Sequence, residues 1–420
     1  MAPEWLLIFP NANADNRHAM PHSNSLRAGV GERWLILAVL FLARTAMGFQ
    51  FQSVAALSSS VVSGLRIDYT QLGLLIGLYL LPGIAIAYPG GVLGRRFGDK
   101  RIALLGMTLM VAGGFLTATG TDYASVFAGR LISGVGAVLL NVLLTKMTTD
   151  WFVGSEIGTA LAILVSSWPI GIGIALVTLP WLATRASTAA AFGSTAAVAT
   201  VVLILIAAIY RAPSVAITPH PLEDEVRPRL SRRELGLVSL AGAVWMLFNV
   251  GYIIVVSFGP ALLMARGLSV RDAGFATSLV SWAVIVTIPL GGVLIDRMGH
   301  ATLLMIASSA AFGLSTMLVP TAPSLSLMTF AGAVAGLPAG AMMVLPSEVL
   351  KPQNRGAGMG VFYTWYYAGM ALSTPVAGIL RDLTGAPGVP LIFAGGLELA
   401  AMAVLVLFRL SQRQYEGLAR

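Results

Sequence analysis

The chain of 420 residues contains no cysteine and very little charge. Without cysteine there is neither a disulfide framework nor a thiolate metal site, and the four histidines all lie outside the apolar runs. We therefore expect no metal and no cofactor. Only 10% of the residues are charged, whereas soluble domains carry about 25%. This deficit excludes an ordinary soluble protein.

Apolar residues fill the place of the missing charges: 57% of the chain is hydrophobic and the mean hydropathy is +0.83. Runs of about 20 apolar residues, each long enough to cross about 30 Å of hydrocarbon, recur along the chain. They fall near residues 34–58, 69–94, 102–119, 123–146, 156–183, 188–210, 236–263, 272–295, 301–320, 325–347, 356–380 and 390–408. Continuous runs favour helices over barrel strands. The pattern predicts an all-α polytopic membrane protein with twelve transmembrane helices.

The distribution of Lys and Arg predicts the orientation in the membrane. With the N-terminus inside, 19 of the 26 basic residues fall on inner segments and 5 on outer connections. Basic residues accumulate on the cytoplasmic side, so both termini are expected in the cytoplasm and the protein in the cell (inner) membrane. Basic loops facing anionic lipid account for the formal charge of +8, and no nucleic acid partner is expected.

The hydrophilic segments divide the chain into two halves. We expect a disordered cytoplasmic tail at 1–32, six-helix bundles at 33–210 and 235–410, a linker rich in proline and charge at 211–234, and a second tail at 411–420. The halves also share a glycine spacing, since Gly73, Gly91 and Gly98 recur 201 residues later as Gly274, Gly292 and Gly299. Parallel repeats place a substrate site at their interface near the bilayer midplane.

Two short segments carry a family resemblance. Gly91, Arg95, Arg96 and Gly98 lie in a segment that resembles the major facilitator superfamily signature between the second and third helices, and Gly292, Asp296, Arg297 and Gly299 repeat it in the second half. The resemblance covers about residues 33–410. It implies the twelve-helix major facilitator fold, secondary transport by alternating access and a monomeric functional unit.

In that family the signature loop clamps the cytoplasmic helix ends together in the outward-open state. The family's usual acidic residue is Arg95 in the first copy of this chain, whereas Asp296 keeps it in the second. The expected partners on neighbouring inner connections are Asp150 and Glu156 for Arg95 or Arg96, and Glu348 and Arg355 for Asp296 and Arg297. Ordinary loop charges that orient the chain are the alternative interpretation.

Arg44 and Arg130 are the basic residues placed well inside apolar runs. Each costs at least ~2.5 kcal/mol at the bilayer centre, and the rise of a helix places both near mid-depth. A guanidinium matches carboxylates and small oxyanions, so we expect a small organic or inorganic anion between the two. Their placement resembles that of anion:cation symporters, which carry acids where this chain has Ala43 and Ala137; nitrate and cyanate permeases are an equally good match. A structural role is the alternative for Arg130.

Other polar and aromatic residues are candidates for the same cavity. The predicted substrate-binding positions besides the arginines are Gln52, Ser167, Trp245, Asn249, Tyr252, Tyr363 and Tyr366. Aromatic stripes also serve as packing surfaces. Glu398 is the acid embedded in the last apolar run, where it either carries a proton or packs against a polar neighbour.

Prolines inside two of the apolar runs predict helix bends. Pro82 and Gly83 in the second run, and Pro338 among glycines in the tenth, mark helix bends that accompany rocking of the bundles. Whether an ion is co-transported or exchanged with the substrate is left open.

The competing functions are efflux of amphipathic drugs or other neutral or cationic solutes, and a membrane solute sensor. An enzyme is disfavoured because no catalytic cluster is present within the helices.

Overall fold

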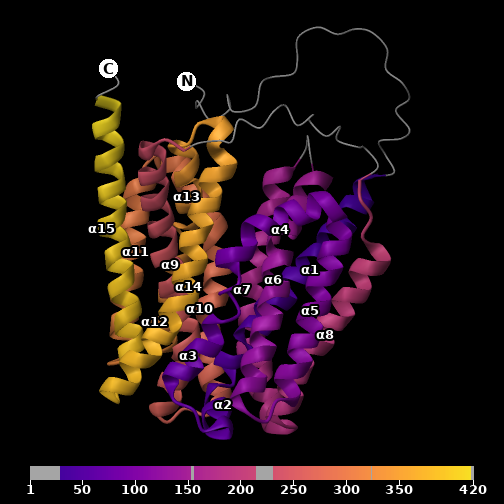
Figure 1. The fold of residues 1–420 in the computed structure, drawn as a ribbon. Helices are drawn as coiled ribbons and strands as arrows, with labels where there is room; N and C mark the ends of the chain where they lie inside the picture. Colours follow the sequence, from indigo (N-terminus) through magenta and orange to yellow (C-terminus); the bar gives the residue numbers. More distant parts are fainter. Residues whose placement is uncertain (1–28, 153–155, 214–229, 323, 418–420) are drawn as a thin grey trace.

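The structure is a computed structural model that describes residues 29–152, 156–213, 230–322 and 324–417, and within them it is almost entirely helical (Figure 1). The α-helices are α1 Gly29–Ala56, α2 Ser58–Leu65, α3 Tyr69–Gly77, α4 Gly83–Phe97, α5 Asp99–Thr119, α6 Tyr123–Trp151, α7 Ile157–Arg185, α8 Thr188–Ile209, α9 Arg232–Ala265, α10 Val270–Met298, α11 Ala301–Leu318, α12 Leu325–Gly336, α13 Ala339–Val344, α14 Arg355–Thr384 and α15 Val389–Gly417. Two short 3-10 helices, η2 Leu345–Glu348 and η3 Pro352–Asn354, precede α14. We call the end where α15 finishes, at the top of Figure 1, the top end, and the opposite end the bottom end.

Within the described residues these helices form twelve spans, which confirms the predicted fold class. The helix pairs α1/α2 and α3/α4 make one span each, as do α12, α13 and η2 together. Ten spans contain a helix that is long and apolar enough to cross a membrane. The other two are α3/α4, whose pieces are short, and the tyrosine-rich α14.

Local sequence signals set the helix ends and breaks. The side chains of Asp122, Ser187 and Ser269 cap α6, α8 and α10 by accepting a backbone N–H three residues on, and such a cap contributes about 1 kcal/mol. The second span breaks at Leu78–Pro82 and the tenth at Leu337–Pro338. Both breaks confirm the bends predicted at the prolines, which cannot continue the backbone hydrogen-bond ladder.

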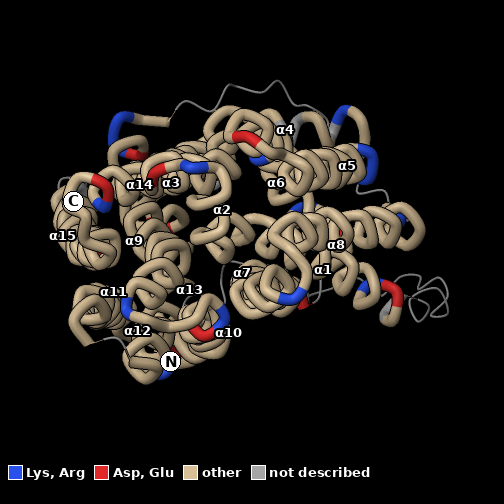
Figure 2. Tube along the Cα trace, turned by 90° about the horizontal axis from the view of Figure 1, so that it is seen from below, with Lys and Arg blue, Asp and Glu red and all other residues tan. Residues whose placement is uncertain are grey.

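The spans pack as two bundles of six (Figure 1). In the first, α1 packs on α7 and α8, and α5 packs on α6 and α8. In the second, α9 packs on α14 and α15, α11 packs on α15, and α10 packs on α12. Figure 2 shows where the bundles meet, with α3 beside α14 and α7 beside α10.

The repeated glycines lie where the two bundles touch. A Cβ added at Gly73 of α3 would lie 2.3 Å from the carbonyl oxygen of Thr374 in α14, and one added at Gly274 of α10 would lie 2.3 Å from that of Leu176 in α7. These equivalent positions let backbones approach closely, which small residues permit between membrane helices. Both contacts are in the lower half of the molecule, so the bundles are packed tightly toward the bottom end.

The predicted segment boundaries agree only approximately with the helix bounds. Helix α1 begins at Gly29 inside the predicted N-terminal tail, α9 begins at Arg232 inside the predicted linker, and α15 continues to Gly417 inside the predicted C-terminal tail. Most of the predicted linker, at 214–229, and most of the N-terminal tail, at 1–28, lie outside the described residues.

Candidate functional site

Arg44 is a half-buried cation in the middle of α1. Its Nε is buried, and its guanidinium makes no hydrogen bond or ion pair with any described residue. Its charge acts electrostatically on the phenol groups of Tyr366, Tyr363 and Tyr367, all on α14 of the other bundle. The free guanidinium of the first bundle therefore faces a tyrosine cluster of the second.

An aromatic wall lies beside this cluster. The indole ring of Trp245 in α9 is near parallel to the rings of Phe362 and Tyr366, with centroids 6.2 and 6.5 Å away. The Nε1–H of Trp245 is buried and has no acceptor among the described residues. One turn further along α9, the half-buried Asn249 donates its Nδ2–H to the carbonyl of Trp245. The wall thus offers flat apolar faces and one free N–H donor.

A hydrogen bond joins the two bundles beside the tyrosine cluster. Asn141 of α6 donates through Nδ2 to the hydroxyl of Tyr367, 2.9 Å away. The Tyr367 ring packs on Gly83 at the start of α4, where a Cβ would lie 2.2 Å from the ring. Neither Asn141 nor Tyr367 is among the predicted ligands, although an amide within an apolar run is a usable sequence signal.

Arg130 does not share this environment, and the expectation of paired arginines around one ligand needs correction. Its Nε donates to the carbonyl of Leu75, and its two terminal nitrogens donate to the carbonyls of Gln50 and Phe51, all at 2.9–3.0 Å. The guanidinium also lies 4.7 Å above the ring of Tyr79, and the residue is 1% exposed. Arg130 therefore joins α6 to α1 and α3, which is the structural alternative.

Three other predicted ligands are bound to fixed protein groups. Gln52 donates through Nε2 to the carbonyl of Val256 in α9, 2.7 Å away. The hydroxyl of Ser167 donates to a carbonyl within its own helix, and the hydroxyl of Tyr252 is 2.9 Å from that of Ser281 in α10. All three are buried, and none is coupled to Arg44. The structure brings together Arg44, Trp245, Asn249, Tyr363 and Tyr366.

The charge pairs at the top end hold each bundle together internally. Asp150 pairs with Lys146, which also contacts Asp99 at the start of α5. Glu156 pairs with Arg33 of α1 at 2.5 Å, and Glu348 pairs with Arg409 of α15. The predicted partners for these acids were Arg95 or Arg96 and Arg297. The observed partners lie in α1, α6 and α15 rather than in the loop signatures.

The remaining predicted gating residues are exposed or lie at a turn. Arg96, Asp296, Arg297 and Arg355 are exposed and make no ion pair within the described part of the chain. Gly98 has a φ of +90° between α4 and α5, a conformation that favours glycine. Gly91 and Arg95 lie in α4, and their side-chain surroundings fall outside the described residues.

At the bottom end, polar contacts join the bundles directly. Asp382, near the end of α14, accepts the backbone N–H groups of Tyr69 and Thr70 at 3.1 and 2.7 Å, and the hydroxyl of Thr70 at 2.7 Å. Arg381 lies 3.4 Å above the Tyr69 ring. A carboxylate at a helix N-terminus is favoured by the helix dipole, so Asp382 holds the first turn of α3. We call this set of contacts the bottom latch.

The bottom latch also has a signal in the sequence. Gly378, Asp382 and Gly385 have the spacing of Gly292, Asp296 and Gly299, and both final glycines end a helix at a φ of about +66°. A Cβ at Gly378 would lie 2.1 Å from the carbonyl oxygen of Tyr69. The loop signature therefore has a third copy, at the opposite end of the molecule.

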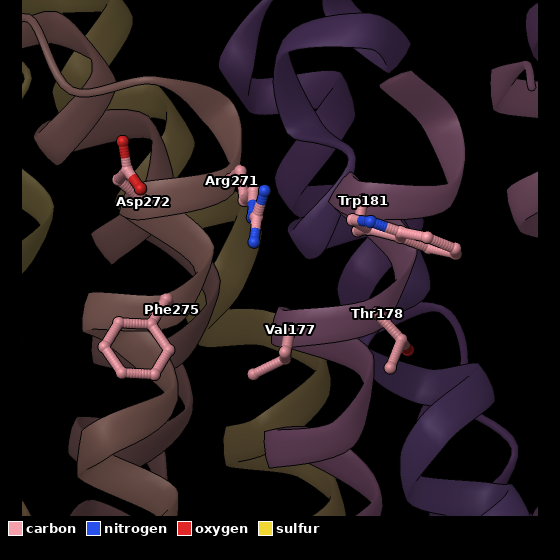
Figure 3. Close-up of a pocket in the computed structure, with 6 residues that line it drawn as sticks. All are labelled: Val177, Thr178, Trp181, Arg271, Asp272 and Phe275. Carbon is pink, nitrogen blue, oxygen red and sulfur yellow. The ribbon is translucent and has the colours of Figure 1, made fainter. Parts of the chain in front are cut away.

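A separate cavity of about 510 Å³ lies low between α7 and α10 (Figure 3). It is lined by Val177, Thr178, Trp181, Arg271, Asp272 and Phe275. Trp181, Arg271, Asp272 and Phe275 are exposed, so the cavity is a groove on the outer surface. None of the predicted ligands lines it, and it is distinct from the Arg44 site.

Comparison with known proteins gives one consistent result. The family model described as Major Facilitator Superfamily matches residues 36–270 and 240–419. A 3-(3-hydroxy-phenyl)propionate transporter of Escherichia coli (strain K12) is 26% identical over 89% of this chain and 93% of its own. The lysosomal dipeptide transporter MFSD1 of Homo sapiens is 21% identical over 92% and 88%. The solved xylose transporter XylE from E. coli, in an inward open conformation, has a TM-score of 0.74 at 14% identity, covering 90% of this chain and 96% of that one.

Proposed function

The chain belongs to the major facilitator superfamily, and on that premise we propose that it is a secondary transporter that moves a small organic anion by alternating access, with Arg44 binding the anion. The relatives are transporters rather than enzymes. The observation that carries the proposal is the contrast between two intramembrane arginines. The charge of Arg130 is held by three carbonyls, whereas that of Arg44 has no fixed partner.

An unpaired guanidinium inside a membrane protein is costly, and a bound anion removes that cost. Insertion of an arginine at mid-bilayer costs at least ~2.5 kcal/mol. A carboxylate accepts two parallel N–H bonds from a guanidinium. The nearby phenol hydroxyls of Tyr363 and Tyr366 can donate to the same carboxylate. Arg44 is therefore the element of the site that selects for negative charge.

The aromatic wall refines the substrate class to aromatic carboxylates. The half-buried rings of Trp245 and Tyr366 lie near parallel beside Arg44, and offset ring stacking contributes about 0.5–1.5 kcal/mol per pair. An inorganic anion has no ring to place on these faces. The E. coli relative is described as a transporter of a hydroxyphenyl propionate, which is a molecule with a ring and a carboxylate.

We further propose that the top end is cytoplasmic and that this structure is the inward-open state. The basic loops gather at that end, as expected for cytoplasmic loops. The bottom latch joins the bundles at one end, whereas the charge pairs at the other end stay within each bundle. Both observations fit the inward-open state. In the opposite state, the loop signatures around Gly91, Arg95 and Asp296 would join the top ends of the bundles.

The first prediction tests charge selection at Arg44. In proteoliposomes, wild-type carrier should exchange labelled 3-phenylpropionate and prefer it at least about tenfold over the neutral 3-phenylpropanamide, a difference of about 1.4 kcal/mol. Arg44→Ala should abolish exchange and Arg44→Lys should retain part of it, because lysine keeps the charge without the planar fork. Arg413→Ala, which removes an exposed arginine of α15 outside the loop signatures, is the matched control.

Two outcomes would contradict this proposal. Equal exchange of the acid and its amide, or full exchange by Arg44→Ala, would show that the site does not select negative charge. The aromatic wall would then favour the competing function, efflux of amphipathic neutral or cationic solutes. Competition assays with such solutes against labelled substrate separate the two.

A further inference from the structure

Glu398 is an acid buried in the middle of a membrane span. It lies on α15, is 0% exposed, and both carboxyl oxygens are buried without a hydrogen-bond partner among the described residues. No other charged residue occurs between Val389 and Phe408 of the same helix. Buried carboxyl groups are ordinarily paired or hydrogen-bonded, so this position needs an explanation.

Two glycines on neighbouring helices make room for this side chain. A Cβ at Gly251 of α9 would lie 2.3 Å from Oε1 of Glu398 and 2.9 Å from its carboxyl carbon. A Cβ at Gly313 of α11 would lie 3.2 Å from the Cβ of Glu398. Any larger residue at 251 would occupy the carboxyl position. The fold therefore contains a niche shaped around an acid with no countercharge.

The same face of α11 carries two further unpaired polar groups. Ser309 and Thr316 are 1% exposed, and their hydroxyls have no hydrogen-bond partner within the described residues. They lie four residues before and three residues after Gly313, and these spacings put all three positions on one helix face. Hydroxyls both donate and accept hydrogen bonds, so the side of α11 that carries Gly313 also carries free polar groups.

No described charged group lies close enough to compensate an ionised Glu398. Helices α9, α11 and α14 pack against α15. Helix α11 has no charged residue. The charged residues of α9 are at its top end, namely Arg232, Arg233 and Glu234. Those of α14 are at its two ends (Arg355, Arg381 and Asp382), and the others on α15 are Arg409, Arg413 and Glu416. Arg409 is 11 residues from Glu398, or about 16 Å at 1.5 Å per residue. The tyrosine beside the niche, Tyr252, bonds to Ser281, and the tyrosines of α14 face Arg44.

An isolated carboxylate in this niche would be an uncompensated buried charge. Such a group loses its hydration and gains nothing in exchange, so it takes up a proton and becomes neutral. The packed niche of this conformation therefore holds the neutral acid. Ionisation of Glu398 requires the niche to open.

Helix α9 connects the niche to the substrate site. Gly251 is two residues from Asn249 and six from Trp245, and the carbonyl of Val256 in the same helix accepts the hydrogen bond from Gln52 of the other bundle. Substrate contact at Trp245 and relative motion of the bundles both act on α9. The same helix forms one side of the Glu398 niche, so movement of α9 can expose the carboxyl to water.

We propose that Glu398 is a proton-binding site that couples the movement of one proton to that of each carboxylate substrate. This inference rests on the proposed function. When the niche opens, an Oε of the carboxylate takes a proton from water and the O–H bond forms; when it opens on the other side, that bond breaks and the proton leaves to water. An anion and a proton that move together carry no net charge, so the membrane potential does not oppose uptake.

The test uses full-length carrier in liposomes that contain a pH-sensitive dye, with 3-phenylpropionate as the probe. In wild type, a substrate gradient should drive proton flux, and a pH gradient should drive accumulation. Glu398→Gln mimics the neutral acid without a removable proton. It should keep substrate exchange and lose at least about tenfold of the pH-driven accumulation. Glu32→Gln, which neutralises an exposed acid in the first turn of α1, should behave as wild type.

The outcomes separate this inference from the proposed function. If a 3-phenylpropionate gradient drives no proton flux in wild type although the substrate crosses, or if Glu398→Gln still accumulates it in a pH gradient, the proton site is wrong and the carrier function stands. If no carboxylate moves, the proposed function is itself wrong. Should Glu398→Gln not fold, Gly251→Ala displaces the carboxyl instead and should shift the pH dependence of accumulation by at least about one pH unit; an unchanged dependence overturns the proposal.

Discussion

At the scale of single residues, two arginines with the same hydropathic setting have different environments. Arg130 donates to three carbonyls and stacks on Tyr79, whereas Arg44 lies before a tyrosine cluster without a fixed partner. A buried charge that is fully hydrogen-bonded contributes to structure, and one that is left open is available to a ligand. In the proposed function, one guanidinium rather than a pair is therefore available to the substrate.

The corresponding prediction concerns stability. Arg130→Met should remove the guanidinium that donates to the carbonyls of Leu75, Gln50 and Phe51, and leaving a buried polar group without its partner costs about 1–3 kcal/mol. The variant should unfold at a clearly lower temperature in detergent than wild type, whereas Arg44→Ala should not. A normal melting temperature for Arg130→Met together with lost substrate binding would assign Arg130 to the ligand instead.

At the scale of elements, the first turn of α3 is held by a residue 313 positions away. Asp68 caps α3 within the first bundle, and Asp382 accepts the N–H groups of Tyr69 and Thr70 from the second. The helix dipole favours a carboxylate at this position. The interaction between the N-terminus of α3 and Asp382 thus helps to hold the bundles together at the bottom end.

Weakening the bottom latch should open that end more often. Asp382→Asn removes the charge, and a loss of about 1 kcal/mol changes a two-state ratio about fivefold. Thr374 is 1% exposed at the α3–α14 contact, and because the native chain has no cysteine, Thr374→Cys supplies one labelling site. Asp382→Asn should raise its rate of maleimide labelling several-fold. An unchanged rate would mean that the acid does not stabilise the closed end.

At the scale of the whole molecule, the two bundles meet through glycines and the bottom latch in the lower half, and their top-end ion pairs stay within each bundle. Rocking of one bundle on the other then requires separation of α3 from α14 and of α7 from α10. The glycines at 73 and 274 provide flat backbone contacts, which separate without disentangling large side chains.

A disulfide across the bottom latch should stop transport. Thr70 and Asp382 touch through their side chains, with Oγ1 and Oδ2 2.7 Å apart, so Thr70→Cys and Asp382→Cys together place two thiols side by side across the bundles of a chain without native cysteine. Substrate exchange in liposomes should fall to background and return on reduction. The two single variants under the same oxidant serve as controls. Continued exchange by the verified crosslinked protein would contradict rocking of the bundles.

The amino-acid sequence was enough to predict the span count, the all-helical class and the breaks at Pro82 and Pro338. These features depend on hydropathy and backbone chemistry within about 20 residues, which is local information. The separate roles of Arg44 and Arg130, the partner of Glu156 and the latch at Asp382 are visible only in the folded molecule. Those outcomes depend on carbonyls and charges 55 to 313 residues away in the sequence. Apolar patterning does not specify which helices pack together or which helix faces make the contact.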